Sequence, residues 1–174
     1  APPIGTPVTG ATFTSTSLFT ATPTATATAT NPPTPVPTLN FNLPPNFGST
    51  ALTSGFIPDP FTMGLISGGT VDVSYLGAGC TGFAATAPDF SVNYTSGAFQ
   101  ALRFYFIGGG DTTMIINGPG ANYFCNDDSF STLNPTLDFN SPSSGRYDIW
   151  IGSFSSGTSI SGTLSVTENL ANHP

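Results

Sequence analysis

The chain has 174 residues, of which only 6% are charged, with nine acidic side chains, two arginines, no lysine and a net charge of -7. This acidic balance would repel phosphate backbones and anionic lipid, so we expect no nucleic-acid partner. The single histidine, His173, is the penultimate residue, which excludes a catalytic triad or a histidine-rich metal site inside a folded core.

Two features indicate export. The low charge is typical of extracellular rather than cytosolic proteins. The chain also begins with Ala1-Pro2-Pro3 and lacks a basic and apolar leader, so we expect a mature form whose signal peptide has been removed. The apolar runs fall short of the roughly 18 to 20 residues that cross a bilayer, so no membrane span is expected.

Residues 1–40 form an uncharged arm or stalk that is rich in Thr, Pro and Ala and cannot build a core of its own. From Thr20 to Thr30, Thr occupies every even position and Ala or Pro23 every odd one, so an extended backbone would place all the hydroxyls on one face. Phe13 and Phe19 lie at odd positions, on the Ala side, and are the candidate assembly residues.

Three interpretations of the arm stay open: a polyproline-like spacer, an O-glycosylated stalk, and a strand-forming arm that pairs with another molecule. The candidate O-glycosylation sites are the six threonines of the alternating run: Thr20, Thr22, Thr24, Thr26, Thr28 and Thr30.

After a connector at residues 41–58, residues 59–174 are predicted to form one all-β domain, an antiparallel jelly-roll-like β-sandwich of about eight strands. The apolar stretches are short and separated by Gly, Pro, Asn and Ser, and no stretch predicts a long helix. The expected strands are Phe61–Ser67, Thr70–Leu76, Asp89–Thr95, Ala101–Ile107, Thr112–Asn117, Tyr123–Cys125, Arg146–Ser153 and Ser159–Thr167.

The two cysteines, Cys80 and Cys125, are predicted to form a disulfide, because an even count in an exported chain favours pairing. The alternative is two buried, unreactive thiols. Zinc is excluded, because two cysteines and a terminal histidine do not complete its ligand set.

A series of motifs runs in order through residues 56–168: Gly79-Cys80-Thr81-Gly82-Phe83, Ala87-Pro88-Asp89-Phe90, Leu102-Arg103-Phe104-Tyr105-Phe106, Asp111-Thr112-Thr113-Met114-Ile115-Ile116-Asn117, Tyr123-Phe124-Cys125-Asn126-Asp127-Asp128-Ser129, Asn134-Pro135-Thr136-Leu137-Asp138-Phe139 and Ser144-Gly145-Arg146-Tyr147-Asp148-Ile149-Trp150-Ile151-Gly152. This set resembles the bacterial pre-peptidase C-terminal (PPC) domain. The resemblance implies a small, non-catalytic β-sandwich of bacterial origin, usually attached to an exported enzyme. Here no enzyme accompanies it on the chain.

Acidic and amide side chains within these motifs are the candidate calcium ligands, since calcium takes six to eight oxygen ligands and some members of that family bind it. The candidates are Asp111, Asn126, Asp127, Asp128 and Asp138. The alternative is that they cap turns and pair with Arg103 or Arg146. No cofactor is required by either interpretation.

Catalysis is not expected. Asp127 and Asp128 are adjacent, so in a strand they would point to opposite faces, and no Gly-x-Ser-x-Gly motif is present. Asn93 begins an N-glycosylation sequon, Asn93-Tyr94-Thr95. Tyr94, Tyr105, Tyr123 and Trp150 are candidates for a sugar-binding aromatic platform, although most aromatics are expected in the core.

The leading hypothesis is a non-catalytic extracellular structural protein, the self-assembling subunit of a surface filament or pilus-like appendage. Its partner would be a second copy of the chain, which receives the arm by strand addition. One alternative is an accessory module that binds protein or polysaccharide for a secreted hydrolase. A third is a calcium-stabilised adhesin domain on a mucin-like stalk.

Overall fold

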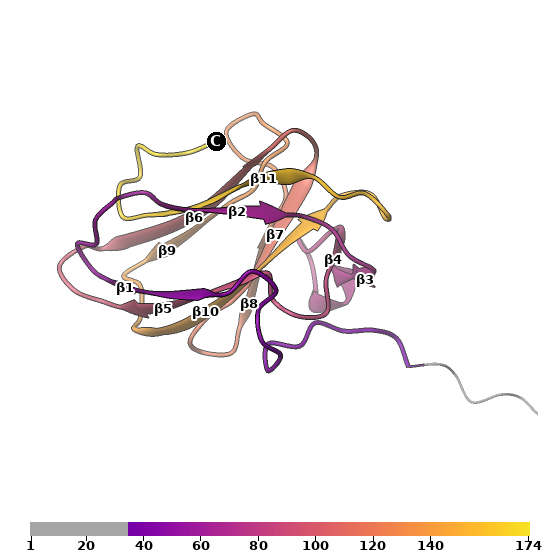
Figure 1. Cartoon of the computed structure of the whole chain (residues 1–174), viewed down its shortest axis with the longest axis horizontal. Coiled ribbons are helices and arrows are strands. Elements are labelled where there is room, and N and C mark those ends of the chain that lie inside the picture. Colours follow the sequence, from indigo (N-terminus) through magenta and orange to yellow (C-terminus); the bar gives the residue numbers. More distant parts are fainter. Residues whose placement is uncertain (1–34) are drawn as a thin grey trace, which may run out of the picture. The chain divides into compact units, whose positions relative to one another are not determined.

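A computed structural model describes residues 35–174, which form one compact unit. The assembly residues Phe13 and Phe19 and the candidate glycosylation sites Thr20 to Thr30 lie outside the described residues. Within residues 35–174 the structure is almost entirely β, in two layers, as the composition and punctuation predicted (Figure 1).

Eleven strands and one short 3₁₀ helix make up the described part of the chain. In order they are β1 (Ser49–Thr53), β2 (Phe61–Ile66), β3 (Val71–Asp72), the 3₁₀ helix η1 (Val73–Leu76), β4 (Phe83–Ala84), β5 (Phe90–Thr95), β6 (Ala101–Gly108), β7 (Thr112–Asn117), β8 (Tyr123–Asn126), β9 (Thr136–Asn140), β10 (Gly145–Ser153) and β11 (Ser161–Thr167).

The larger sheet is built around β10, the longest strand. Its first half pairs with β5, which in turn pairs with β1, and its last residue, Ser153, pairs with Phe83 of β4. On the other side β10 pairs with β7, followed by β8. The smaller sheet has the order β2-β11-β6-β9. All these pairs are antiparallel except β1 with β5, which is parallel.

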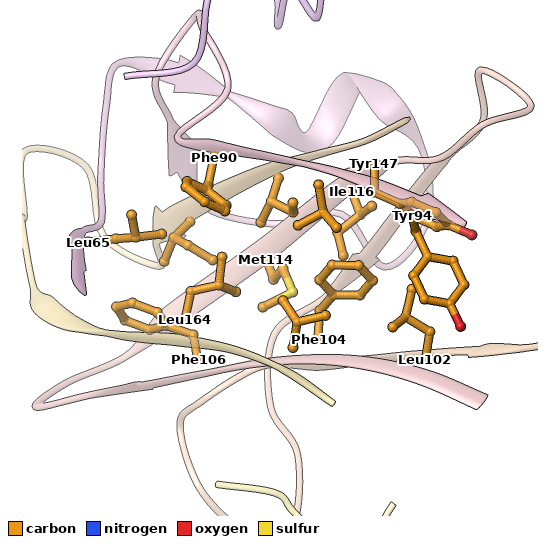
Figure 2. Close-up of a cluster of buried hydrophobic side chains, with 14 of the residues drawn as sticks. Leu65, Phe90, Tyr94, Leu102, Phe104, Phe106, Met114, Ile116, Tyr147 and Leu164 are labelled. Carbon is orange, nitrogen blue, oxygen red and sulfur yellow. The ribbon is translucent and has the colours of Figure 1, made fainter. Parts of the chain in front are cut away.

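The main core lies between the two sheets (Figure 2). Its side chains come from alternate positions of the strands, such as Leu102, Phe104 and Phe106 of β6, which are fully buried. In β10, Tyr147, Ile149 and Ile151 also face this core. The predicted alternation of β10 is therefore confirmed, and it decides which side chains are left for the outer face.

A second, smaller core covers part of the outer face of the larger sheet. Trp150 of β10 and Ile115 of β7 are fully buried there against Val73 of η1. The predicted disulfide between Cys80 and Cys125 is present and packs against this cluster. It fastens the loop after η1 to the edge strand β8.

Four elements differ from the sequence-based expectation, one of which is the unexpected two-residue strand β4, paired with β3. The stretch 70–76 is a two-residue strand followed by η1, because the Asp72 carboxylate accepts a hydrogen bond from Ser74 N at 2.9 Å and caps the helix. Within the stretch predicted as a connector, β1 adds to the larger sheet. Strand β9, which was not expected, pairs with β6.

The aromatic platform predicted from Tyr94, Tyr105 and Trp150 is wrong. All three side chains are buried, and the hydroxyl of Tyr94 donates to Oε1 of Glu168 at 2.6 Å. Tyr123 packs against Trp150 at the edge of the second core. The strands' alternation places these rings in the interior, where they contribute packing.

We expect the double variant Cys80→Ala/Cys125→Ala to lose up to ~4 kcal/mol of unfolding free energy, because the disulfide closes a loop with a sequence separation of 45. Urea unfolding monitored by Trp150 fluorescence measures this loss. The natural chain in reducing agent should approach the double variant, whereas the double variant should not respond to reductant. Equal stability of the two proteins would contradict a stabilising role.

A second prediction concerns Asp89, which is 2% exposed and accepts hydrogen bonds from Ile151 N at 2.8 Å and from the Asn46 amide at 3.2 Å. Burial raises the pKa of Asp89 to about 7 despite these two bonds. Since the folded pKa exceeds the unfolded one, this contribution to stability is fully present below about pH 4 and is lost as the pH rises through 7.

We therefore expect the thermal unfolding midpoint to decrease as the pH rises from 4 to 7, and Asp89→Asn, which keeps an acceptor for Ile151 N, to reduce that decrease. The exposed Asp72→Asn is the matched control, and Asn is also a good cap for η1. Thermal melts at each pH give the measurement. A slope that Asp89→Asn leaves unchanged would assign the pH dependence to other groups.

Candidate functional site

Among the described residues, the longest sheet edge without any charged side chain is strand β2. Its six residues pair with β11 on one side only, and among residues 35–174 no strand pairs with the other side. Phe61 and Met63 are partly buried and pack against the main core, whereas Ile66 on the opposite face is 50% exposed. An unpaired strand of this kind presents free backbone N–H and C=O groups to a further strand.

The start of β2 is fixed by Asp59. Its carboxylate accepts hydrogen bonds from the Thr167 hydroxyl and, at 3.3 Å, from Glu168 N, both at the end of β11. Glu168 in turn accepts a bond from Gly55 N at 2.7 Å, which holds the β1–β2 connection. The edge is therefore anchored at its beginning.

Strand β1 is the corresponding edge of the larger sheet, on the same side of the molecule as β2 (Figure 1). It too lacks charged residues, and within the described chain it pairs only with β5. At the opposite side, β8 carries the disulfide through Cys125, and β9 carries Asp138 in an ion pair with Arg103 at 2.6 Å. The edges of β1 and β2 thus lie on one side without a charge or a disulfide, whereas β8, although also uncharged, is held by the disulfide.

Sequence reasoning missed β1. The signal was weak, because Ser-Thr-Ala-Leu-Thr does not alternate between polar and apolar residues; only Gly48 and Gly55, both with positive φ, mark turns on either side. Turn glycines of this kind are typical of the ends of a short strand. Its parallel pairing with β5, in contrast, could not be read from the pattern.

A cluster of three carboxylates lies elsewhere, where Asp111 before β7 meets Asp127 and Asp128 after β8. The antiparallel pairing of β7 with β8 brings these ends together, so that one oxygen of each side chain lies within 4.8 Å of the others. Oδ1 of Asp111 and Oδ1 of Asp127 are buried and have no hydrogen-bond partner among the described residues.

The electrostatics of this cluster are unfavourable without a cation. Desolvation, followed by the charges of Asp128 and Asp111, raises the pKa of Asp127 to about 6. Desolvation and the Asp128 charge also raise the pKa of Asp111. Three carboxylates with buried, unpartnered oxygens match the hard oxygen ligands that calcium takes.

The other two predicted calcium ligands do not join the cluster. Asn126 uses its side-chain oxygen to accept bonds from the Ser129 hydroxyl and from Thr136 N, both at 2.8 Å. Both carboxylate oxygens of Asp138 accept hydrogen bonds from Arg103, at 2.6 and 2.7 Å. For these two residues the structure therefore shows the turn-stabilising and ion-pairing roles that were the alternative.

Arg103 does more than pair with Asp138. It is 5% exposed, and its Nη1 donates to the backbone oxygens of Leu170 and Asn172 at 2.8 and 3.0 Å, which holds the C-terminal segment against β6. His173, at the end of that segment, stacks on Phe130 with ring centroids 4.2 Å apart. The predicted N-glycosylation residue, Asn93, is exposed in the middle of β5.

No family model and no curated protein matches the chain. The resemblance to the PPC family therefore stays a prediction. Among solved structures, the chain is similar to PliG of Aeromonas hydrophila, a periplasmic lysozyme inhibitor of g-type lysozyme. The identity is 15%, over 68% of this chain and 96% of that chain, with a TM-score of 0.39. The function proposed below depends on the geometry of the chain itself.

The disulfide places the chain in an oxidising compartment, as in a secreted or periplasmic protein. In the part of the chain that the structure describes, no helix has the length and apolar character needed to cross a membrane.

Proposed function

We propose that the chain is a non-catalytic extracellular structural subunit that joins a second copy of itself, with the arm of one copy added as a strand to the β2 edge of the next. The observation that carries this proposal is the uncharged and unpaired edge of β2. Natural β-proteins usually protect such edges with Lys, Pro or a bulge, because an open edge invites a further strand.

The arm has the composition that this edge requires. The alternating run Thr20–Thr30 has eleven residues, enough to pair along the six residues of β2. In strand addition, backbone hydrogen bonds give affinity, and side chains at alternate positions give the register. The odd positions of the arm, such as Phe19 and the alanines that follow it, would then lie beside Phe61 and Met63, where the main core reaches the open side.

Electrostatics favour the same contact. No charged residue occurs in residues 1–58, and β2 is also uncharged, so the arm and the edge approach without repulsion. The charges that give the chain its net -7 all lie from Asp59 onward. Each added copy would present its own β2 edge to another arm. Such head-to-tail contacts propagate instead of closing, and the product is a fibre at the cell surface.

The first test compares the natural chain with a truncated chain that begins at Pro35 and therefore keeps every described residue, including Leu39 of the second core. We expect fibres by negative-stain electron microscopy, and rapid sedimentation, only for the natural chain. Two monomeric samples would contradict the proposal and would favour the alternative, an accessory binding module with a free arm.

The second test blocks the edge with one charge. In β2, an added Cβ at Gly64 meets nothing within 4 Å, so Gly64→Lys leaves the subunit folded but places a cation at the edge. We expect this variant to lose assembly. Gly109, in the turn between β6 and β7, is equally open, so Gly109→Lys is the matched control and should assemble normally. Equal assembly of both variants would exclude the β2 edge.

We also propose that the Asp111, Asp127 and Asp128 cluster binds calcium as a structural ion. The two buried, unpartnered carboxylate oxygens favour this assignment. Calcium would supply the positive charge that the described surroundings of the cluster lack, and the three side chains would hold the turns before β7 and after β8 together.

We expect millimolar calcium to raise the Tm of the natural chain, because a ligand that binds only the folded state stabilises it. Asp127→Asn should abolish the increase, whereas Asp72→Asn, which removes the same charge from an exposed site, should retain it. Calorimetry with calcium, magnesium and a chelator measures the effect. An identical increase with both cations and in both variants would indicate nonspecific screening of the acidic surface.

A further inference from the structure

A row of polar side chains crosses the outer face of the larger sheet. The register places Ser49 of β1 opposite Ser91 of β5, Ser91 opposite Asp148 of β10, and Asp148 opposite Asn117 of β7. Their strand neighbours, such as Val92 and Ile149, face the main core, so these side chains point away from it. Four adjacent strands thus contribute one polar group each to a single line.

Arg146 lies in the next row, opposite Asn93. Its Nε donates to Oδ1 of Asp148 at 2.7 Å, and its Nη2 lies 2.7 Å from the same oxygen and 3.3 Å from the Ser91 hydroxyl. In the described part of the chain these bonds leave Nη1 without a partner, and the side chain is 44% exposed. The guanidinium is therefore fixed on one edge and open on the other.

Two cavities adjoin above this row, with volumes of about 400 and 390 Å³, and Asn42 and Arg146 line both. The first lies over Ser49 and Ser91 and is walled by Leu43, Pro44 and Pro45. The second lies over Asp148 and Asn117 and is walled by Phe41 and Pro119. In Figure 1 the chain segment before β1 passes outside the layer that contains β5 and β10. Residues 42–45 of this segment line the first cavity.

Asn117, at the floor of the second cavity, carries a buried donor without a partner. It is 4% exposed, and its Nδ2 has no hydrogen-bond acceptor among the described residues. The neighbouring acceptor, Oδ1 of Asp148, is already used by Arg146 and by the Ser91 hydroxyl, at 2.5 Å. A buried unsatisfied donor costs about 1–3 kcal/mol, so its place in a cavity points to a ligand that accepts this bond.

The chemistry of the groove defines the ligand class. Arg146 and Asp148 neutralise each other, so the groove has no net charge to attract a phosphate, a carboxylate or a metal ion. What it offers is a mixture of donors and acceptors from amides and hydroxyls, between walls of Phe, Leu and Pro. Ligand sites combine apolar walls with a few placed polar groups, and a neutral polyol has polar edges and apolar faces to match.

We propose that this groove binds a neutral saccharide, with Asn117 Nδ2 and Arg146 Nη1 donating to its oxygens and Asn42 and Asn93 bonding at the rim. The two cavities on either side of Arg146 give room for more than one sugar unit. This site is separate from the β2 edge proposed for assembly, so failure of one proposal leaves the other in place.

The test is a titration of the full-length Gly64→Lys chain, which keeps the groove but is not expected to assemble, with neutral gluco-, manno-, galacto- and N-acetylglucosamine oligosaccharides of two to six units, followed by ¹⁵N NMR. We expect one of these series to shift the Asn117 and Asn93 side-chain amides and the Arg146 Nε–H signal. The rim variants Asn42→Ala and Asn93→Ala, both at exposed residues, should each weaken binding about tenfold.

Asn140→Ala, at an exposed asparagine on β9 of the other sheet, is the matched control and should bind normally. Asn117→Ala removes the orphaned donor, and its folding is checked from its amide spectrum. The proposal is overturned when no neutral series shifts the groove signals, when the shifts map to another face, or when Asn140→Ala weakens binding as much as the rim variants do.

A further experiment distinguishes two sources of the saccharide. If the ligand is a glycan on a second copy, the chain produced in a glycosylating host should self-associate through the groove. Free oligosaccharide, or the variant Asn42→Ala, should then disrupt this contact between copies. If the ligand is an external polysaccharide, an unglycosylated chain and a chain glycosylated only at sites other than Asn93 should bind it equally. Self-association by β2 is separated from both by Gly64→Lys, which leaves the groove intact.

Discussion

The whole domain depends on the strict alternation of β10. Its nine residues pair with β5, β7 and β4, so this strand alone connects the parts of the larger sheet. One set of its side chains, including Ile149, fills the core between the sheets, and the other set divides the outer face in two. Trp150 closes the second core, whereas Asp148 belongs to the polar row and Arg146 lies in the row beside it. A shift of one residue would exchange these environments and bury two charges in the main core.

This division explains how the molecule separates its surfaces. The disulfide and the second core stabilise one end of the outer face, which leaves the other end open as a polar groove. The acidic cluster lies where β7 and β8 end, and the uncharged edges of β1 and β2 lie on a side without acidic clusters. The acidic cluster, the polar groove and the open strand edges thus lie at different places on the domain, and each has the chemistry for a different kind of ligand.

Much of this fold could be predicted from local pattern. The alternation in 146–153 and the glycine-rich turns predicted strands and their inner faces, and the two cysteines predicted their own pairing. The register between distant strands could not be predicted, since nothing local places Asn117 opposite Asp148 or brings β1 parallel to β5. For that reason the acidic cluster was predicted with Asn126 and Asp138, whose partners come from other strands, and the polar row was missed. The prediction of exposed aromatic side chains was wrong, because the burial of a side chain depends on the same long-range pairing between strands.

The small number of basic residues affects how the chain resists proteases outside the cell. Proteases that cleave after Lys or Arg have only two peptide bonds to attack in the entire sequence, those after Arg103 and Arg146. Both arginines lie within paired strands and hold carboxylates, so neither bond can enter a protease cleft in extended form while the sheets are intact. Digestion would have to await unfolding of the strands themselves. Residues 1–58 contain neither Lys nor Arg, so the arm offers such enzymes no cleavage site at all.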